Sequence, residues 1–281
     1  MEQVQVVDYR AGDAAERFTR SLHETGFGVL VNHPIQQGLV EKIYADWLAF
    51  FDGDEKQRYA FSKETQDGWF STAVSETAKG HTQKDLKEYF HIYPWGRVPP
   101  SLKADAMAYY EQANALAGEL LSWVERHTPA EISRHYSEPL SGMIEDSRLT
   151  LLRVLRYPPL NGTEPPGSLR AAAHGDINLL TILPAANEPG LQVQARDGSW
   201  LDVPGDFGML IVNIGDMLEE ASRGHYPSTQ HRVVNPSGEA ATKSRVSLPL
   251  FLHPRPDVVL SERYTSHEYL TERLRELGVK T

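Results

Sequence analysis

The residues of this chain best suited to chemistry are His174 and Asp176, two positions apart in the segment Ala171–Thr181, which reads AAAHGDINLLT. Side chains of an extended segment alternate between its two faces, so we expect this imidazole and this carboxylate to project from the same face. Placed in that way, both can bind one metal ion. A lone His-x-Asp pair is weak evidence, but it occurs at only one of the eleven histidines here.

A third ligand must come from elsewhere, and the best candidate is His231 in the segment STQHRVV. Two imidazoles and one carboxylate on one side of an ion suit non-haem Fe(II) and leave positions open for oxygen and a further ligand. His225 lies only six residues earlier and competes for this role, and His231 alone reads equally well as an ordinary strand histidine. The residue pattern by itself leaves these alternatives open.

A second pair, Arg245 and Ser247, lies on the last predicted strand, where the spacing places both side chains on one face. A guanidinium is a rigid two-pronged donor that matches a carboxylate, and a neighbouring hydroxyl adds a hydrogen bond. Beside an open iron site, this pair would hold the far carboxylate of a dicarboxylic cosubstrate whose 2-oxo acid end chelates the metal. The competing interpretation is a surface arginine paired with an acidic side chain.

The first half of the chain is predicted to be mostly helical. Helical periodicity covers about 13–24, where Gly26 ends the helix, then about 37–51 and about 101–127. A short strand is expected at Phe27–Asn32. The segment Asp67–Pro100 is rich in aromatic residues, which either line a substrate pocket or pack helices onto the core.

The second half changes to short apolar stretches bounded by turn residues, which predicts an antiparallel sandwich or barrel of the jelly-roll kind. A strand is expected at Arg148–Tyr157, and a short helix at Ser266–Leu277 closes the chain. Further strands are predicted at Asn178–Leu183, Gly190–Gln194, Trp200–Val203, Gly208–Ile214, Gln230–Val234 and Ser244–Leu252. The fold class predicted for the whole chain is therefore mainly β with flanking helices.

The composition limits the classes of partner that this protein is expected to bind. The 281 residues carry a formal net charge of -10 without a run of basic residues, which argues against nucleic acid. There is no cysteine, so neither disulfides nor a thiolate nucleophile are available. The start of the sequence does not resemble a signal peptide, and no apolar run reaches membrane length. We expect a cytoplasmic protein that acts on a small molecule, with no membrane partner; the sequence leaves the oligomeric state open.

From about residue 150 onward the chain resembles the isopenicillin N synthase-like branch of the Fe(II)/2-oxoglutarate-dependent dioxygenases. The matching pieces occur in the family's order, and two N-terminal pieces resemble its helical N-terminal region. They are RYPP at 156–159, HGD at 174–176, GLQV at 190–193, VNIGDML at 212–218, STQHRVV at 228–234 and RVSLPLF at 245–251, with GFGVLVNH at 26–33 and DLKE at 85–88 in the N-terminal region.

The resemblance implies a double-stranded β-helix core over 148–281, with a mostly helical region over 1–147 packing on it as one compact unit. It implies iron held by His174, Asp176 and His231, and no further catalytic side chain. It also implies that 2-oxoglutarate chelates the iron, is anchored by Arg245 and Ser247, and is contacted by Tyr157. The expected reaction hydroxylates or desaturates a small molecule with O2 and releases succinate and CO2, with ascorbate as a candidate reductant.

The substrate pocket is predicted to include Arg156, Phe251 and His91, of which Arg156 and His91 would meet an anionic substrate. Two positions depart from the family pattern. Plant members commonly carry Asn two residues before the tyrosine, where this chain has Leu155, and Thr between the metal-binding His and Asp, where it has Gly175. Neither change removes a metal ligand, but Leu155 alters the cosubstrate contacts on that side.

Two other functions fit the same motifs. Isopenicillin N synthase and the aminocyclopropane carboxylate oxidases use no 2-oxoglutarate yet retain a similar Arg-x-Ser, so Arg245 and Ser247 do not separate them from the 2-oxoglutarate users. A non-catalytic binding module on the same fold is the alternative from another class, because a fold does not fix a function. Loss of a metal ligand would mark such a module, and all three ligands are present here.

Overall fold

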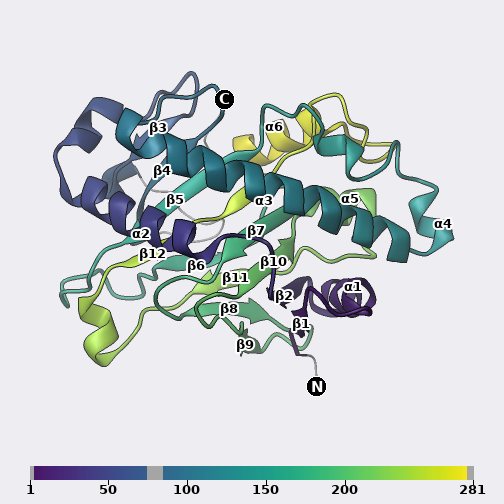
Figure 1. Cartoon of the computed structure of the whole chain (residues 1–281), viewed down its shortest axis with the longest axis horizontal. Coiled ribbons are helices and arrows are strands. Elements are labelled where there is room, and N and C mark those ends of the chain that lie inside the picture. The colour runs from purple at the N-terminus through teal and green to yellow at the C-terminus, as the bar shows by residue number, and fades with distance from the viewer. Residues whose placement is uncertain (1–2, 75–84, 277–281) are drawn as a thin grey trace.

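The computed structural model describes residues 3–74 and 85–276, which form two facing β-sheets with helices on the outer side of the larger sheet (Figure 1). Strands of the larger sheet follow one another in the order β1 (Val6–Asp8), β2 (Phe27–Val31), β10 (Leu210–Ile214), β7 (Leu180–Pro184), β13 (Leu250–Leu252), β5 (Leu151–Tyr157), β4 (Glu88–Ile92) and β3 (Gly68–Phe70), and β12 (Arg245–Ser247) also pairs with β5. The smaller sheet has the order β6 (Ala171–His174), β11 (His231–Val233), β8 (Leu191–Gln194) and β9 (Trp200–Asp202).

The two sheets enclose an apolar layer to which both contribute. Phe27, Leu155 and Tyr157 of the larger sheet belong to the same buried cluster as Val193 and Val233 of the smaller one. Apart from the parallel pair β1–β2, the strand pairs are antiparallel. The prediction of a mainly β fold with a jelly-roll core and flanking helices is confirmed.

Three helices cover the outer face of the larger sheet. Helices α2 (Gln37–Asp52) and α3 (Pro100–His127) cross it, and α1 (Ala14–Thr25) packs against β2 and α3 at its edge (Figure 1). α1 ends at Gly26, whose φ of 75° suits glycine, and α3 begins at a proline, which lacks the N–H that a first turn leaves unpaired. These helices begin and end close to the predicted bounds.

Smaller helical elements complete the chain. They are α4 (Ala130–Ser133), α5 (Asp216–Ala221), α6 (Ser266–Glu276) and the 3₁₀ segments η1 (Glu55–Tyr59), η2 (Thr72–Val74), η3 (Gly142–Ile144) and η4 (Gly238–Thr242). The closing helix was expected to reach Leu277, which lies outside the described residues. Among the described helices, none combines the length and the apolar character needed to cross a membrane.

The aromatic segment Asp67–Pro100 contains two strands, β3 and β4, that were not predicted from the sequence, and its residues 75–84 lie outside the described part of the chain. Strand alternation divides its rings between two roles. Phe90 faces the helical core, whereas Tyr89 and Phe70 face the layer between the sheets. The helix-packing role is therefore filled by Phe90, whereas a substrate-pocket role for the rings that face the inner layer stays a prediction.

Two details of the strand prediction are wrong. The predicted strand Ser244–Leu252 is two strands, β12 and β13, separated by Leu248 and Pro249, because proline has no N–H to continue the ladder. The extended segment predicted through both His174 and Asp176 is also shorter than expected. Strand β6 ends at His174, and Asp176 lies in the loop that connects β6 to β7.

Candidate metal centre

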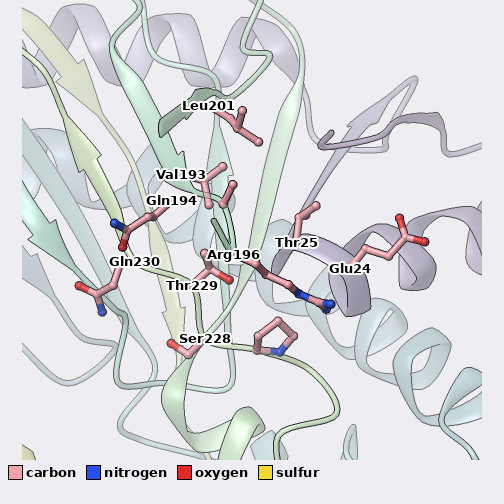
Figure 2. A pocket seen from close by; sticks show the side chains of 11 residues that line it. Glu24, Thr25, Val193, Gln194, Arg196, Leu201, Ser228, Thr229 and Gln230 are labelled. Carbon is pink, nitrogen blue, oxygen red and sulfur yellow. The ribbon is translucent and has the colours of Figure 1, made fainter. Parts of the chain in front are cut away.

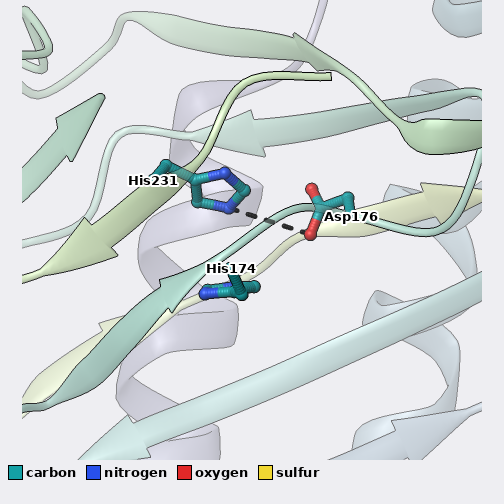
Figure 3. Close-up of side chains that lie close together, drawn as sticks. All are labelled: His174, Asp176 and His231. Carbon is teal, nitrogen blue, oxygen red and sulfur yellow. Dashed lines mark ion pairs between the residues drawn. The ribbon is translucent and has the colours of Figure 1, made fainter. Parts of the chain in front are cut away.

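The structure brings His174, Asp176 and His231 together between the two sheets (Figure 3). One ligand atom from each lies within 4.8 Å of the others, and His231 Nε2 is 3.8 Å from Asp176 Oδ1. First-row divalent ions bind such atoms at roughly 2.0–2.2 Å, so one ion fits between them after small adjustments. Within the described residues this is the one group of three or more such side chains with metal-binding geometry.

Neighbouring strands produce this arrangement. β6 and β11 pair with His174 directly opposite His231, and the two imidazole centroids lie 4.4 Å apart. The register of this pairing shifts by one residue between His231 and Val233, so that Ala171 lies opposite Val233. Ala171 and His174 therefore both lie opposite inward-facing residues of β11. His225, the competing third ligand, instead stacks on His23 with ring centroids 4.2 Å apart.

Backbone carbonyls set the tautomers of both imidazoles. His174 Nδ1 lies 2.8 Å from the carbonyl oxygen of Ala172, and His231 Nδ1 lies 3.2 Å from that of Thr229. A carbonyl only accepts hydrogen bonds, so each Nδ1 carries the proton and donates it. Each Nε2 then keeps its lone pair for a metal, as is usual for metal-binding histidines.

The carboxylate of Asp176 is oriented by two neighbours that were not identified from the sequence. Thr181 Oγ1 and Asn213 Nδ2 both donate to Asp176 Oδ2, at 2.5 and 2.8 Å, which leaves Oδ1 on the side of His231. Asn213 and Thr181 face each other across β10 and β7. Asn213 stands in the family-like piece VNIGDML, which was the available signal, but its partner becomes apparent only once β7 and β10 pair.

Electrostatics favour the metal-binding forms of these side chains. Burial, reinforced by the nearby His231, lowers the pKa of His174 to about 4, so its imidazole is neutral near pH 7. Burial opposes ionisation of Asp176, but the two imidazoles and the hydrogen bonds from Asn213 and Thr181 outweigh it and hold its pKa below the ordinary value. A neutral imidazole and an ionised carboxylate are what a divalent metal requires.

Gly175, one of the two departures from the family pattern, has a packing reason. A Cβ at this position would lie 3.1 Å from Asp216 Oδ1, 3.2 Å from Gln230 Nε2 and 3.2 Å from Ser228 Oγ. Asp216 and Ser228 are themselves joined by a 2.6 Å hydrogen bond. This polar group lies where a side chain at position 175 would begin.

A buried ion pair holds β6 from outside the sheet. Lys87 Nζ lies 2.8 Å from Asp85 Oδ2, and both side chains are 4% exposed. The other oxygen, Asp85 Oδ1, accepts the N–H of Ala172, two residues before His174. The N-terminal half of the chain thus contributes to the position of a candidate ligand.

The predicted cosubstrate residues lie on the inner face of neighbouring strands. Arg245 is directly opposite Tyr157, and Ser247 opposite Leu155, in the pairing of β12 with β5. The Arg245 guanidinium lies over the Tyr157 ring, 5.2 Å from its centroid, and its Nε donates to the carbonyl of Glu188. Arg245 and Ser247 are buried, so the alternative of a surface arginine paired with an acid does not hold.

The three predicted substrate-pocket residues do not lie on one face of the larger sheet. Phe251 is opposite Thr181 in the register of β13 and β7, so it shares the face that carries the contacts to Asp176. His91 lies on the inward face of β4 and accepts a 2.9 Å hydrogen bond from Arg153 Nε. Arg156 points to the helical face instead, where it pairs with Asp52 at 2.6 Å and with Glu88 at 3.1 Å.

Arg153, which was not singled out from the sequence, occupies the inward position on β5. Its guanidinium lies 4.5 Å from the ring centroid of Tyr89 and 5.2 Å from that of Phe251. Burial lowers the pKa of the nearby His253 to about 4, and the charges of Asp176 and Arg153 also act on it. Period-two counting back from Tyr157 would have selected Arg153 over Arg156.

A hollow of about 200 Å³ lies outside the metal centre and is lined in part by Ser228, Thr229 and Gln230 (Figure 2). Glu24, Arg196, Leu201 and the segment 227–230 line it, and none of the three candidate ligands does. It is therefore distinct from the metal centre.

Comparison with known proteins agrees with this geometry. Residues 149–254 match the model of the 2OG-Fe(II) oxygenase superfamily, and residues 5–113 match that described as non-haem dioxygenase in morphine synthesis N-terminal. Jasmonate-induced oxygenase 4 of Arabidopsis thaliana is 32% identical over 86% of this chain and 69% of its own length.

Solved structures extend the likeness to nearly the whole chain. An oxygenase from Shewanella oneidensis shares 61% identity and a TM-score of 0.90 over 99% of both chains. A 2OG-Fe(II) oxygenase family protein from Caulobacter crescentus shares 32% identity and a TM-score of 0.81 over 99% of this chain and 100% of its own. The chain belongs to the 2OG-Fe(II) oxygenase superfamily and is an Fe(II)- and 2-oxoglutarate-dependent dioxygenase.

Proposed function

We propose that this dioxygenase holds its iron with His174 Nε2, Asp176 Oδ1 and His231 Nε2. The observation that carries the proposal is the convergence of these atoms within 4.8 Å, with both Nδ1 positions and Asp176 Oδ2 already engaged by the protein. Two imidazoles and one carboxylate form the facial triad of non-haem Fe(II) enzymes. Thr181 and Asn213 orient the carboxylate.

We further propose that Arg245 and Ser247 anchor the distal carboxylate of 2-oxoglutarate and that Tyr157 packs beside it. The buried position of all three on one inner face supports this assignment. Arg245 binds and orients; it moves no proton, because a guanidinium stays protonated. The comparisons favour 2-oxoglutarate use over the cosubstrate-free oxidases and over a non-catalytic module, since the family and the Caulobacter relative are described as 2OG-Fe(II) oxygenases.

Bound iron, with 2-oxoglutarate and O2, supplies oxidative decarboxylation to succinate and CO2 and the oxidising power to remove hydrogen from a substrate. The chain contributes orientation and a dry interior. Phe27 packs edge-on against His231 with ring centroids 5.5 Å apart, and the surrounding apolar layer limits water around the ligands. Ascorbate is proposed as the reductant that keeps the iron in its divalent state.

On the substrate side, we propose a small molecule with an anionic group and an apolar part. Arg153 supplies the cation, and the Tyr89 and Phe251 rings that flank it supply apolar surface. His91 positions Arg153 through the hydrogen bond between Arg153 Nε and its own Nε2. Arg156 is not included, because its side chain lies on the opposite face of β5, beside Asp52 and Glu88.

Two coarser proposals concern the protein as a whole. The net charge of -10 and the absence of cysteine support a cytoplasmic enzyme without a nucleic-acid or membrane partner. The region 1–147 and the core 148–281 are proposed to fold as one unit, because β2 and β4 of the first hydrogen-bond to β10 and β5 of the second.

The test is substrate-stimulated succinate release by the Fe(II)-loaded protein over a panel of small carboxylic acids, each paired with its neutral amide. The acids are expected to stimulate turnover and their amides to do so at least about 10-fold less, the weight of one charge-assisted hydrogen bond. Arg153→Met should remove the preference for the acid. Stimulation by acids and amides alike would contradict the anionic substrate, whereas absence of any 2-oxoglutarate-dependent succinate would contradict the dioxygenase.

A further inference from the structure

A second arginine, Arg170, is buried at the same end of the space between the two sheets as Arg245. It directly precedes β6 and is 0% exposed. Its Nη2 donates to the carbonyl oxygen of Lys243 at 3.0 Å, two residues before Arg245. The side-chain amide of Asn235 fixes the backbone around it, since Oδ1 accepts the N–H of Arg170 and Nδ2 donates to the carbonyl of Ser168.

Polar atoms at this end of the barrel lack partners. Within the described residues, Arg170 Nε and Nη1, Arg245 Nη1 and Ser168 Oγ are buried without a hydrogen bond. Neither guanidinium makes an ion pair with a described residue, although the charge of Glu188 acts on both. A buried cation without a partner is costly, and two together are more so.

The charge of Arg245 also acts on Arg170. Burial, and then the neighbouring charge of Arg245, lowers the pKa of Arg170. Burial lowers the pKa of Arg245, a shift that Tyr157 opposes. Like charges in one low-dielectric space are stabilised most effectively by an anion between them.

We propose that Arg170 is a second binding residue for the distal carboxylate of 2-oxoglutarate, acting together with Arg245. This inference rests on the proposed role of Arg245. A carboxylate has two oxygens with about four lone-pair positions, enough for donors from both guanidiniums. The unpartnered Arg170 Nε and Nη1 and Arg245 Nη1 supply those donors. The pair selects a dicarboxylic 2-oxo acid over a monocarboxylic one of equal length.

The experiment compares two ligands and two proteins. Anaerobic Fe(II)-loaded wild type and Arg170→Met are titrated with 2-oxoglutarate and with 2-oxopentanoate, which has the same chain length without the distal carboxylate. Binding is followed by calorimetry and visible absorption. The variant should bind 2-oxoglutarate about 10- to 100-fold more weakly, as expected for loss of a charge-assisted hydrogen bond, and 2-oxopentanoate within about twofold of wild type.

Thermal unfolding separates a binding role from a structural one. Arg170→Met removes a buried charge that makes no ion pair with a described residue, so the apo variant should melt at or above the Tm of wild type. Arg232→Met is the matched control: Arg232 lies on β11 beside His231 but stacks on Trp200, with its Cζ 4.0 Å from the ring centroid, and should leave both affinities unchanged. Arg170→Lys, which keeps the charge, should restore part of the selectivity.

Three outcomes would overturn the inference. Equal affinity of wild type and Arg170→Met for 2-oxoglutarate would remove Arg170 from the site while leaving the dioxygenase assignment intact. Equal weakening of both ligands, together with a lower Tm, would show a structural role. Failure of wild type itself to bind 2-oxoglutarate would overturn both this inference and the proposed cosubstrate site.

Discussion

The space between the two sheets has a metal end, with His174, Asp176 and His231, and an arginine end, with Arg170 and Arg245. The two ends differ in how many of their buried polar groups have hydrogen-bond partners within the protein. At the metal end, His174, Asp176 and His231 each have one atom held by the protein and one turned toward the common centre. At the arginine end, the described residues leave buried N–H groups of Arg170 and Arg245 without partners. On the proposed assignments, the first site is shaped before its ion binds, whereas the second depends on its anionic ligand to neutralise the two guanidiniums.

The largest loss of activity is expected from removing a proposed metal ligand. Asp176→Ala removes the one anionic ligand, and we expect loss of stoichiometric iron and of succinate release. Metal content after desalting and succinate formation measure this. Asp206→Ala, an exposed aspartate, is the control and should behave as wild type. A fully active, iron-loaded Asp176→Ala would remove Asp176 from the ligand set.

A substitution at the arginine end should weaken 2-oxoglutarate binding without changing iron binding at the metal end. Arg245→Met is expected to raise the Kd for 2-oxoglutarate by about 100-fold, through loss of charge-assisted hydrogen bonds, with iron content unchanged. Anaerobic calorimetry and metal analysis of the same samples test both statements. An unaltered Kd would refute the anchoring role, and loss of iron would show that the two ends are not independent.

Removing a hydrogen bond to Asp176 should have an intermediate effect on Fe(II) affinity. Asn213→Ala or Thr181→Val each removes one hydrogen bond to Oδ2, and we expect each to lower Fe(II) affinity about 10-fold. Competition with a metal-binding dye measures this. Affinity equal to that of wild type in the double variant would mean that the metal alone orients the carboxylate.

The smallest effect is expected at Gly175. An added Cβ would press on Asp216, Ser228 and Gln230, so Gly175→Ala should lower the free energy of unfolding by about 1 kcal/mol. Urea denaturation measures this, with Gly12→Ala as control because no atom lies within 4 Å of the position that a Cβ would take there. A stabilised Gly175→Ala would show that these side chains move aside without cost.

Sequence patterns predicted most elements and the grouping of the three candidate metal ligands, because these rest on local periodicity and on motif chemistry. The helices, most strands and the meeting of His174, Asp176 and His231 followed from these patterns. What they missed depends on pairing across the sheets. Asn213 faces Thr181 only through the pairing of β10 with β7, and Arg170 contacts Lys243, just before β12; both partners are far away in sequence. The faces of Arg153 and Arg156 are the exception, because period-two alternation along β5 places Arg153 on the face of Tyr157 and Arg156 on the opposite one.

Crystals grown with Fe(II) and 2-oxoglutarate under argon, measured at the iron absorption edge, would test the central claim most directly. We predict one anomalous peak within roughly 2.3 Å of His174 Nε2, Asp176 Oδ1 and His231 Nε2. Density for the distal carboxylate should lie within hydrogen-bond distance of Arg245 Nη1. An iron peak elsewhere, or a distal carboxylate remote from Arg245, would contradict the account.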